Sequence, residues 1–159
     1  MNPYAKYLDG RKPLEVLAET PSVLTQLVQA MGAAGMECRY GEGKWSAREI
    51  LCHLADTEQV FAFRLRQTLS QDHHVIQPFD QEAWAVRYKA IPGDAALGVF
   101  CAARHWNILL LHTIREEDVL KPVTHPERGD MTFATILETM AGHDMNHRAQ
   151  LKSIAERKG

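Results

Sequence analysis

The feature that most constrains the fold is a helical segment near the end of the chain that places two histidines on its apolar side. Apolar residues recur at helical spacing in this segment and form one face: Phe133, Ile136, Leu137, Met140, Leu151 and Ile154. At about 100° per residue, His143 and His147 lie on that same face. A buried polar group without a partner costs about 1–3 kcal/mol, so both imidazoles need partners inside the fold.

Two arrangements give these imidazoles partners. A shared metal ion would take one lone pair from each ring, because side chains at i and i+4 lie one helical turn apart. Alternatively, each ring is a core histidine with its own hydrogen bond. The chain has eight histidines, so the spacing alone does not decide between these alternatives. A third ligand elsewhere in the chain would favour the metal.

Composition indicates a single domain, residues 1–159, and excludes several classes of function. The chain has 159 residues, of which 45% are hydrophobic, and this is enough for a sizeable core. Its net charge of −2 gives no basic footprint for nucleic acid. No apolar run has the length of a membrane span, and the N-terminal residues lack the apolar region of a signal peptide. We therefore expect a small-molecule substrate, with neither nucleic acid nor membrane as a partner.

The cysteines and the size of the chain lead to two further expectations. Cys38, Cys52 and Cys101 are an odd, scattered set without a CxxC motif. This pattern is typical of reduced thiols, so we expect a cytoplasmic protein. A homodimer through helix faces is common for helical bundles of this size, although no residue demands it.

Hydrophobic periodicity predicts four amphipathic helices. The first runs from position 13 or 21 to 31, and the second begins at a capping box of Ser46 and Glu49 and continues to about position 69. The third spans about 94–115, and the fourth begins at Thr132 and ends near position 155. No segment alternates with the period of a strand, although 124–129 is typical of a tight turn or small hairpin. An all-α four-helix bundle follows, in which the long link 70–93 lets helices two and three run parallel.

The second helix carries two polar residues on or near its apolar stripe. His53 lies at the edge of the stripe, where the alternative to a metal ligand is an interfacial histidine bonded to a backbone carbonyl. Glu58 lies inside the stripe, so it either reaches solvent or needs a buried donor or cation. If helices two and four are neighbours, His53 can meet His143 and His147. Three protein ligands would leave a coordination position for water or substrate, as in catalytic metal sites.

Other polar residues have weaker roles in this interpretation. The second ring nitrogens of the three histidines need acceptors, and the candidates are Glu58, Asp144, Asn146 and Gln150. The adjacent His73 and His74 are expected to be exposed, and Arg104 and Arg148 to be solvated surface arginines. The general-base glutamate of an H-E-x-x-H motif is absent, which argues against peptide hydrolysis by that route. No catalytic side chain beyond the histidines is assigned.

Four segments of the chain carry a resemblance to a known family: GKWSAREILCHLADTE (43–58), FDQEAW (79–84), HPERG (125–129) and AGHDMNHRAQ (141–150). They resemble the DinB-like family, which includes metal-dependent hydrolase-like and thiol-transferase-like proteins of bacteria. The resemblance implies an up-down-down-up four-helix bundle with a long crossover between helices two and three. It also implies that His53, His143 and His147 bind a divalent metal, often nickel or zinc, in a cleft. Characterised relatives include transferases that use a low-molecular-weight thiol such as bacillithiol or mycothiol.

These observations lead to a hypothesis with two alternatives. The protein is expected to be a metal-dependent thiol transferase or hydrolase, in which a thiol or a water at the open metal position loses its proton and attacks a small electrophile. Nothing in the sequence separates a thiol from a water. The alternative function is a metal-binding or stress-response protein without catalysis. In the remaining alternative the histidines are structural and bind no metal.

Overall fold

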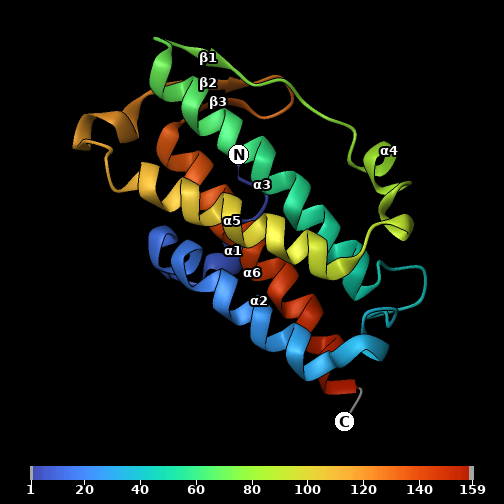
Figure 1. Ribbon diagram of the computed structural model, residues 1–159. Helices are drawn as coiled ribbons and strands as arrows, with labels where there is room; N and C mark the ends of the chain where they lie inside the picture. Colours follow the sequence, from blue (N-terminus) through green and yellow to red (C-terminus); the bar gives the residue numbers. More distant parts are fainter. Residues whose placement is uncertain (1, 158–159) are drawn as a thin grey trace.

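The computed structural model describes residues 2–157, and four long helices dominate it. They are α2 (Pro13–Gly35), α3 (Ala47–Ser70), α5 (Gly93–Leu111) and α6 (Phe133–Arg157). Helices α2 and α6 run in one direction, whereas α3 and α5 run in the opposite direction (Figure 1). Each helix packs mainly against the helix that runs in the same direction, α2 on α6 and α3 on α5. The two pairs also contact each other, through α3 on α6 and α2 on α5. The predicted up-down-down-up four-helix bundle is confirmed.

The link between α3 and α5 returns the chain along the outside of the bundle, so that the two helices run parallel (Figure 1). It contains β1 (His74–Val75), the short helix α4 (Gln81–Ala85) and the 3-10 turn η1 (Tyr88–Ala90). Tyr88 attaches this link to the bundle, because its ring is buried and its hydroxyl donates a hydrogen bond to Asp56 Oδ2 at 2.8 Å.

A small sheet lies at the end of the bundle where α3 ends and α6 begins (Figure 1). Strands β2 (Pro122–His125) and β3 (Gly129–Thr132) are antiparallel, and β1 pairs with β2 in parallel. Gly129 has φ +78°, a conformation that glycine adopts without strain at the end of a tight turn. The hairpin predicted at 124–129 is confirmed. The absence of strand alternation in the sequence has a simple reason, because strands of two to four residues are too short to show it.

Two helix ends follow local signals. Ser46 Oγ accepts a hydrogen bond from the Glu49 backbone N–H, and the Glu49 carboxylate accepts one from the Ser46 N–H, so the predicted capping box is confirmed. The expected end of the first regular helix before Gly32 is also confirmed, because Gly32 has the non-helical angles φ 59° and ψ −176°. A short helical segment follows this kink, so α2 as a whole reaches Gly35.

Buried polar residues divide the core into two apolar clusters. One cluster centres on Leu24, Ile50 and Leu151, and the other on Leu17, Leu65 and Met140. Between them lies a group of buried polar residues that we call the polar layer: Thr20, Thr57, Glu58, Arg104, Asn107, His143, Asp144 and His147. His53 lies one turn before Thr57 on α3 and is also buried. All four long helices contribute to this layer, so its polar groups must find their partners across the bundle.

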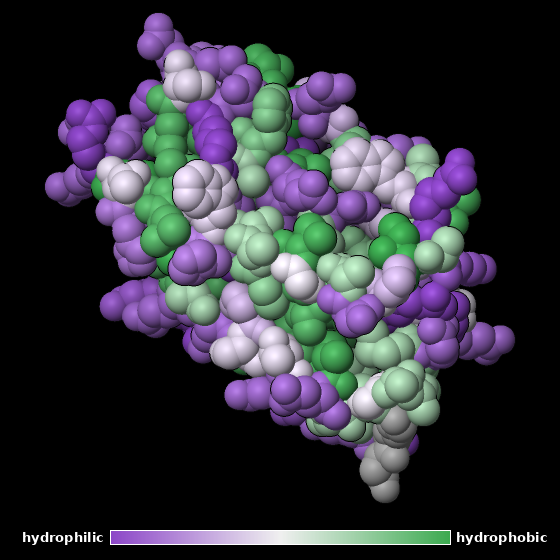
Figure 2. Space-filling model, viewed as in Figure 1, coloured by the Kyte–Doolittle hydropathy of each residue, from purple (hydrophilic) through white to green (hydrophobic). Residues whose placement is uncertain are grey.

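The surface exposes some hydrophobic side chains. Figure 2 shows hydrophobic surface along the middle of one face, mixed with hydrophilic side chains around it. On α5, Val99, Trp106 and Leu109 are exposed. Within residues 2–157, no helix combines the length and the apolar character that a bilayer crossing needs. The homodimer and the cytoplasmic location stay predictions.

The N-terminal segment packs on α6 because residue 142 has no side chain. The short helix α1 (Ala5–Leu8) contacts α6, and a Cβ added at Gly142 would lie 2.8 Å from Tyr4 Cβ and would also clash with the Tyr4 carbonyl oxygen. The Tyr4 ring lies edge-on to the His143 ring, with 5.2 Å between the centroids. Gly142 therefore keeps this segment beside the candidate site.

We predict that Gly142→Ala lowers the free energy of unfolding by about 1–3 kcal/mol, because the new methyl group displaces the Tyr4 backbone. The matched control is Gly98→Ala on α5, where a Cβ meets nothing within 4 Å. That change should raise the free energy of unfolding by about 0.5–1 kcal/mol through helix propensity alone. Urea denaturation of both variants measures the difference. Equal gains in stability for the two variants would contradict the close approach of Tyr4.

Candidate metal centre

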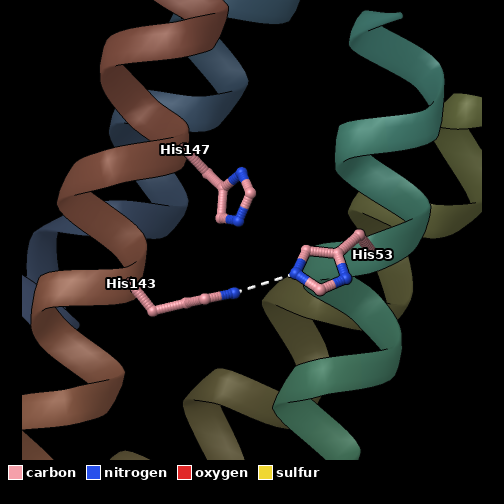
Figure 3. A group of neighbouring side chains, drawn as sticks. All are labelled: His53, His143 and His147. Carbon is pink, nitrogen blue, oxygen red and sulfur yellow. Dashed lines mark hydrogen bonds between the residues drawn. The ribbon is translucent and has the colours of Figure 1, made fainter. Parts of the chain in front are cut away.

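The structure brings together the three histidines predicted as ligands (Figure 3). His53 Nε2 lies 2.9 Å from His143 Nε2, and one ring nitrogen from each of the three residues lies within 4.8 Å of the other two. The three side chains are 1–5% exposed. His143 and His147 stand one turn apart on α6, and His53 faces them from α3. Within residues 2–157, no fourth His, Cys, Asp or Glu side chain joins this group.

Aromatic rings surround the histidines and limit how the imidazoles rotate. The Trp45 ring lies 4.8 Å from that of His53, and Tyr4 and Phe61 lie edge-on to His143. Trp45 directly precedes the capping box of α3, so the start of this helix also positions the ring that covers His53. The site is therefore a confined space between two helices.

Burial keeps all three imidazoles neutral at neutral pH. Desolvation, followed by the nearby His147, lowers the pKa of His53 to about 3. Desolvation lowers the pKa of His147 to about 4, although the contact with Gln150 opposes the shift. Desolvation and the two neighbouring histidines hold the pKa of His143 well below 6.5. A neutral imidazole has one lone pair to give, which is the form that binds a metal ion.

The donor set fits a divalent metal ion. Nitrogen ligands at about 2.0–2.1 Å from a tetrahedral ion lie about 3.3 Å from each other. The observed 2.9 Å contact and the 4.8 Å limit bracket this spacing, so small ring movements are enough to reach it. His147 Nδ1 lies 2.8 Å from Gln150 Oε1, an acceptor that fixes the proton on Nδ1 and leaves Nε2 as the donor atom. His53 Nδ1 has no hydrogen-bond partner among the described residues.

Two cavities reach two of the three histidines, one at His147 and one at His143. A cavity of about 340 Å³ reaches His147 and is lined by Tyr4, Tyr40, Gly43, Lys44, Trp45, Gln81, Glu82, Asn146 and Gln150. A cavity of about 70 Å³ reaches His143 and is lined by Tyr4, Thr57, Val60, Phe61, Arg64, Phe79, Gln81, Arg128 and Thr139. Small molecules therefore have access to a site whose protein ligands are otherwise buried.

A buried ionic network lies directly behind the histidines. Arg104 of α5 is 2% exposed, and its guanidinium donates to Glu58 of α3 at 2.7 and 2.9 Å and to Asp144 of α6 at 2.6 and 3.1 Å. Burial lowers the pKa of Arg104, but the two carboxylates outweigh this effect and raise it. Asn107 donates to Glu58 Oε1 at 2.7 Å, and Arg66 donates to Asn107 Oδ1 at 2.7 Å. Each of the three buried charges, Arg104, Glu58 and Asp144, thus makes at least two hydrogen bonds.

Arg104 also reaches the fourth helix. Its Nη1 donates to the Leu17 carbonyl oxygen of α2 at 3.0 Å. In a regular helix this carbonyl would accept from the N–H of residue 21, but residue 21 is proline and has none. Pro21 therefore leaves an acceptor open inside the bundle, and Arg104 fills it.

The structure corrects several expectations about polar residues. Of the four candidate acceptors, Gln150 lies against the ring of His147, whereas Glu58 and Asp144 face Arg104. The expectation that Arg104 is a solvated surface residue is wrong, because two carboxylates compensate its burial. Arg148 is partly buried and pairs with Glu19 at 2.7 Å.

His73 is exposed as expected, but His74 is 6% exposed and was assigned wrongly. Its strand pairs with β2, and this long-range pairing buries its ring.

The sequence carries a signal for the burial of Arg104 that the expectation of a solvated arginine did not use. Arg104 stands four residues after Phe100 and seven before Leu111, so it lies on the stripe that those apolar residues define. Glu58 lies on the corresponding stripe of α3. An acidic and a basic residue on the apolar stripes of two facing helices indicate a buried ion pair. The positions of Glu58 and Arg104 together therefore predict the network.

The fold and the site together define a class: four-helix bundles with a three-histidine candidate metal centre between two of the helices. The sequence profile of the DinB superfamily matches residues 17–151. The chain belongs to this superfamily, as the resemblance in the sequence implies.

Relatives with similar sequences are described as metal-dependent hydrolases. A candidate metal-dependent hydrolase of Bacillus cereus strain B4264 is 24% identical over 145 residues, which cover 91% of this chain and 84% of that protein. One from Oceanobacillus iheyensis is 26% identical over 143 residues, covering 89% and 83%. The structure is also similar to that of YfiT from Bacillus subtilis, described as a probable metal-dependent hydrolase with an unusual four-helix bundle topology. The TM-score is 0.86 at 25% identity, covering 93% of this chain and 86% of YfiT.

We predict that Arg104→Met lowers the free energy of unfolding by about 3–5 kcal/mol, because it leaves two buried carboxylates without a cation. The control is Arg157→Met, which removes an exposed arginine from the end of α6 and should change stability by less than about 0.5 kcal/mol. Urea denaturation at pH 7 measures both. A change of less than about 1 kcal/mol in Arg104→Met would show that the network does not hold the bundle together.

Proposed function

We propose that this protein is a metal-dependent enzyme whose His53, His143 and His147 bind one divalent ion, nickel or zinc, and activate a water or a thiol. The reaction is hydrolysis of a small molecule or transfer of a low-molecular-weight thiol to a small electrophile. One observation carries the proposal: three neutral imidazole donors converge at the ends of two cavities, with no fourth protein donor among residues 2–157. The description of the relatives as metal-dependent hydrolases supports it.

The metal supplies one chemical effect, since a divalent ion lowers the pKa of a water or thiol that binds to it. The protein supplies position and a confined environment. Arg104 fixes Asp144 and thereby the turn of α6 that carries His143. Gln150 orients His147, and Trp45 and Tyr4 cover His53 and His143. Because the three imidazoles are neutral, the ion keeps its full positive charge. This charge favours an anionic oxygen or sulfur in the open position.

Tyr4 is the residue best placed to hold a proton beside the site. It lines both cavities, and burial raises the pKa of its phenol although Arg128 opposes the shift. The phenol is therefore protonated at neutral pH, and Tyr4 Oη can donate a hydrogen bond to an oxygen of the bound substrate.

The alternative function is metal binding without catalysis, as in a stress-response protein. Sites that only bind or store a metal for structure are usually closed by a fourth protein ligand. A donor set of three, with a cavity of about 340 Å³ at His147, favours an enzyme over that alternative. The cavity is large enough for a small organic molecule.

We predict that protein loaded with nickel or zinc turns over at least one of two kinds of test substrate. The first is an activated ester such as p-nitrophenyl acetate, and the second is 1-chloro-2,4-dinitrobenzene with bacillithiol or mycothiol. The rate should exceed that of the chelated protein by at least about 100-fold and should be lost in His147→Gln, which removes one ligand.

The matched control for this assay is His105→Gln on the exposed side of α5, which should keep full activity. Turnover of the ester alone would assign hydrolysis to the protein. Turnover of 1-chloro-2,4-dinitrobenzene only with a thiol would assign thiol transfer. If metal-loaded and chelated proteins are equally inactive with every pair, or if His147→Gln is as active as the wild type, the proposal is wrong.

A further inference from the structure

A second buried arginine, Arg64, lies near the histidines without a carboxylate partner. It stands on α3, eleven residues after His53, and is 9% exposed. Its Nη2 makes one long contact, 3.4 Å, to the Gln77 carbonyl oxygen, and its Nε has no hydrogen-bond partner. Among residues 2–157, no Asp or Glu forms an ion pair with it. A guanidinium with five N–H donors thus uses only one of them.

The environment of Arg64 is unfavourable for a cation unless another group there compensates its charge. Burial, followed by repulsion from Arg128, lowers the pKa of Arg64 to about 10. The rings of Phe61 and Phe79 lie 5.8 Å from Arg64 Cζ and offset only a part of the lost hydration. Arg104 is more deeply buried, at 2% exposed, but it has carboxylates at 2.6 and 2.7 Å. Arg104 is therefore a compensated structural cation, and Arg64 is an uncompensated one.

Arg64 lines two cavities, one of which reaches the candidate metal centre. It lines the cavity of about 70 Å³ that reaches His143. It also lines a cavity of about 490 Å³, whose other walls include Phe63, Gln77, Phe79 and Trp84. The two cavities share Arg64, Val60 and Phe79, so Arg64 borders both the larger cavity and the one that reaches His143.

The surroundings of Arg64 are positively charged on the side of the histidines. Arg128 lines the smaller cavity, and no acidic residue does. Burial, then Arg128 and Arg64, lower the pKa of the neighbouring His125. Asp56 lines the larger cavity, but it precedes Arg64 by eight residues on α3, about 12 Å along the helix, and accepts a hydrogen bond from Tyr88. The field near Arg64 therefore attracts an anion.

We propose that Arg64 binds the carboxylate of an organic acid and so places the rest of that substrate at the three-histidine centre. This inference rests on the proposed function and names its substrate class. The planar guanidinium offers parallel N–H donors that match two carboxylate oxygens. The aromatic walls of the larger cavity, formed by Phe63, Phe79 and Trp84, fit an apolar body attached to the acid.

The test uses metal-free protein, because a carboxylate would otherwise also bind the metal. The probes are 3-phenylpropanoate, its neutral isostere 3-phenylpropanamide, and phenyl phosphate. Binding is measured by calorimetric titration and by the ligand-induced rise in Tm. The acid should bind wild-type protein about 10- to 100-fold more tightly than the amide, as expected for charge-assisted hydrogen bonds. Arg64→Met should abolish this preference, and Arg157→Met, which lies about 21 Å along α6 from His143, should keep it.

A folding control separates a binding role from a structural one. Without ligand, Arg64→Met should have a Tm equal to or higher than that of the wild type, because it removes a buried cation that has no counter-charge. A structural arginine would give the opposite result, a lower Tm. Arg64→Lys keeps the charge but not the planar donor edge, and should retain only a part of the preference for the acid.

Each outcome bears on the inference independently of the metal. Equal binding of acid and amide by the wild type, or undiminished acid binding by Arg64→Met, would overturn it. Binding of phenyl phosphate without binding of 3-phenylpropanoate would overturn the carboxylate in favour of a phosphate. Because these measurements need no metal, they stand even if the histidines bind none. Conversely, metal-dependent turnover without acid binding would leave the proposed function intact and contradict only the role of Arg64.

Discussion

One guanidinium connects all four long helices. Arg104 belongs to α5, pairs with Glu58 of α3 and Asp144 of α6, and donates to the carbonyl that Pro21 leaves open in α2. These contacts are short and buried, so they depend on the exact relative position of the helices. Apolar packing alone tolerates small sliding movements, whereas a buried charge that loses a partner carries a large desolvation penalty. The network therefore fixes the register of the bundle at its centre.

The position of the histidines follows from this network. Asp144 is the neighbour of His143 in sequence, and Glu58 follows His53 by five residues on the same helix. When Arg104 fixes both carboxylates, it also fixes the helical turns that carry the two imidazoles whose Nε2 atoms lie 2.9 Å apart. The acids of the polar layer are thus used for structure, while the histidines stay neutral and keep their lone pairs. This division leaves a neutral donor set available to the proposed metal ion beside a charged structural layer.

Much of this arrangement could be predicted from local sequence signals. Apolar stripes gave the four helices, the capping box gave the start of α3, and the placement of His143 and His147 on an apolar face indicated a buried site. The long link before α5 allowed parallel helices, which brings α3 against α6. These features depend on spacing along one helix or on one turn, and such spacing is visible in the sequence.

Features that depend on distant partners could not be predicted in the same way. The burial of Arg104 requires Glu58 and Asp144 from two other helices, and that of His74 requires a strand about fifty residues later. Arg64 is the clearest example of a feature that local signals do not predict, because its proposed role depends on having no counter-charge among the described residues.

The central claim is that His53, His143 and His147 bind one metal ion together. Elemental analysis of protein purified without a histidine tag tests it most directly, beside His147→Ala and the exposed-site control His105→Ala. The account predicts about one nickel or zinc per chain in the wild type and in His105→Ala, and none in His147→Ala. An equal metal content in all three proteins would place the ion elsewhere. A wild type that contains no metal and takes up none from an excess would contradict the account and return the three histidines to a purely structural role.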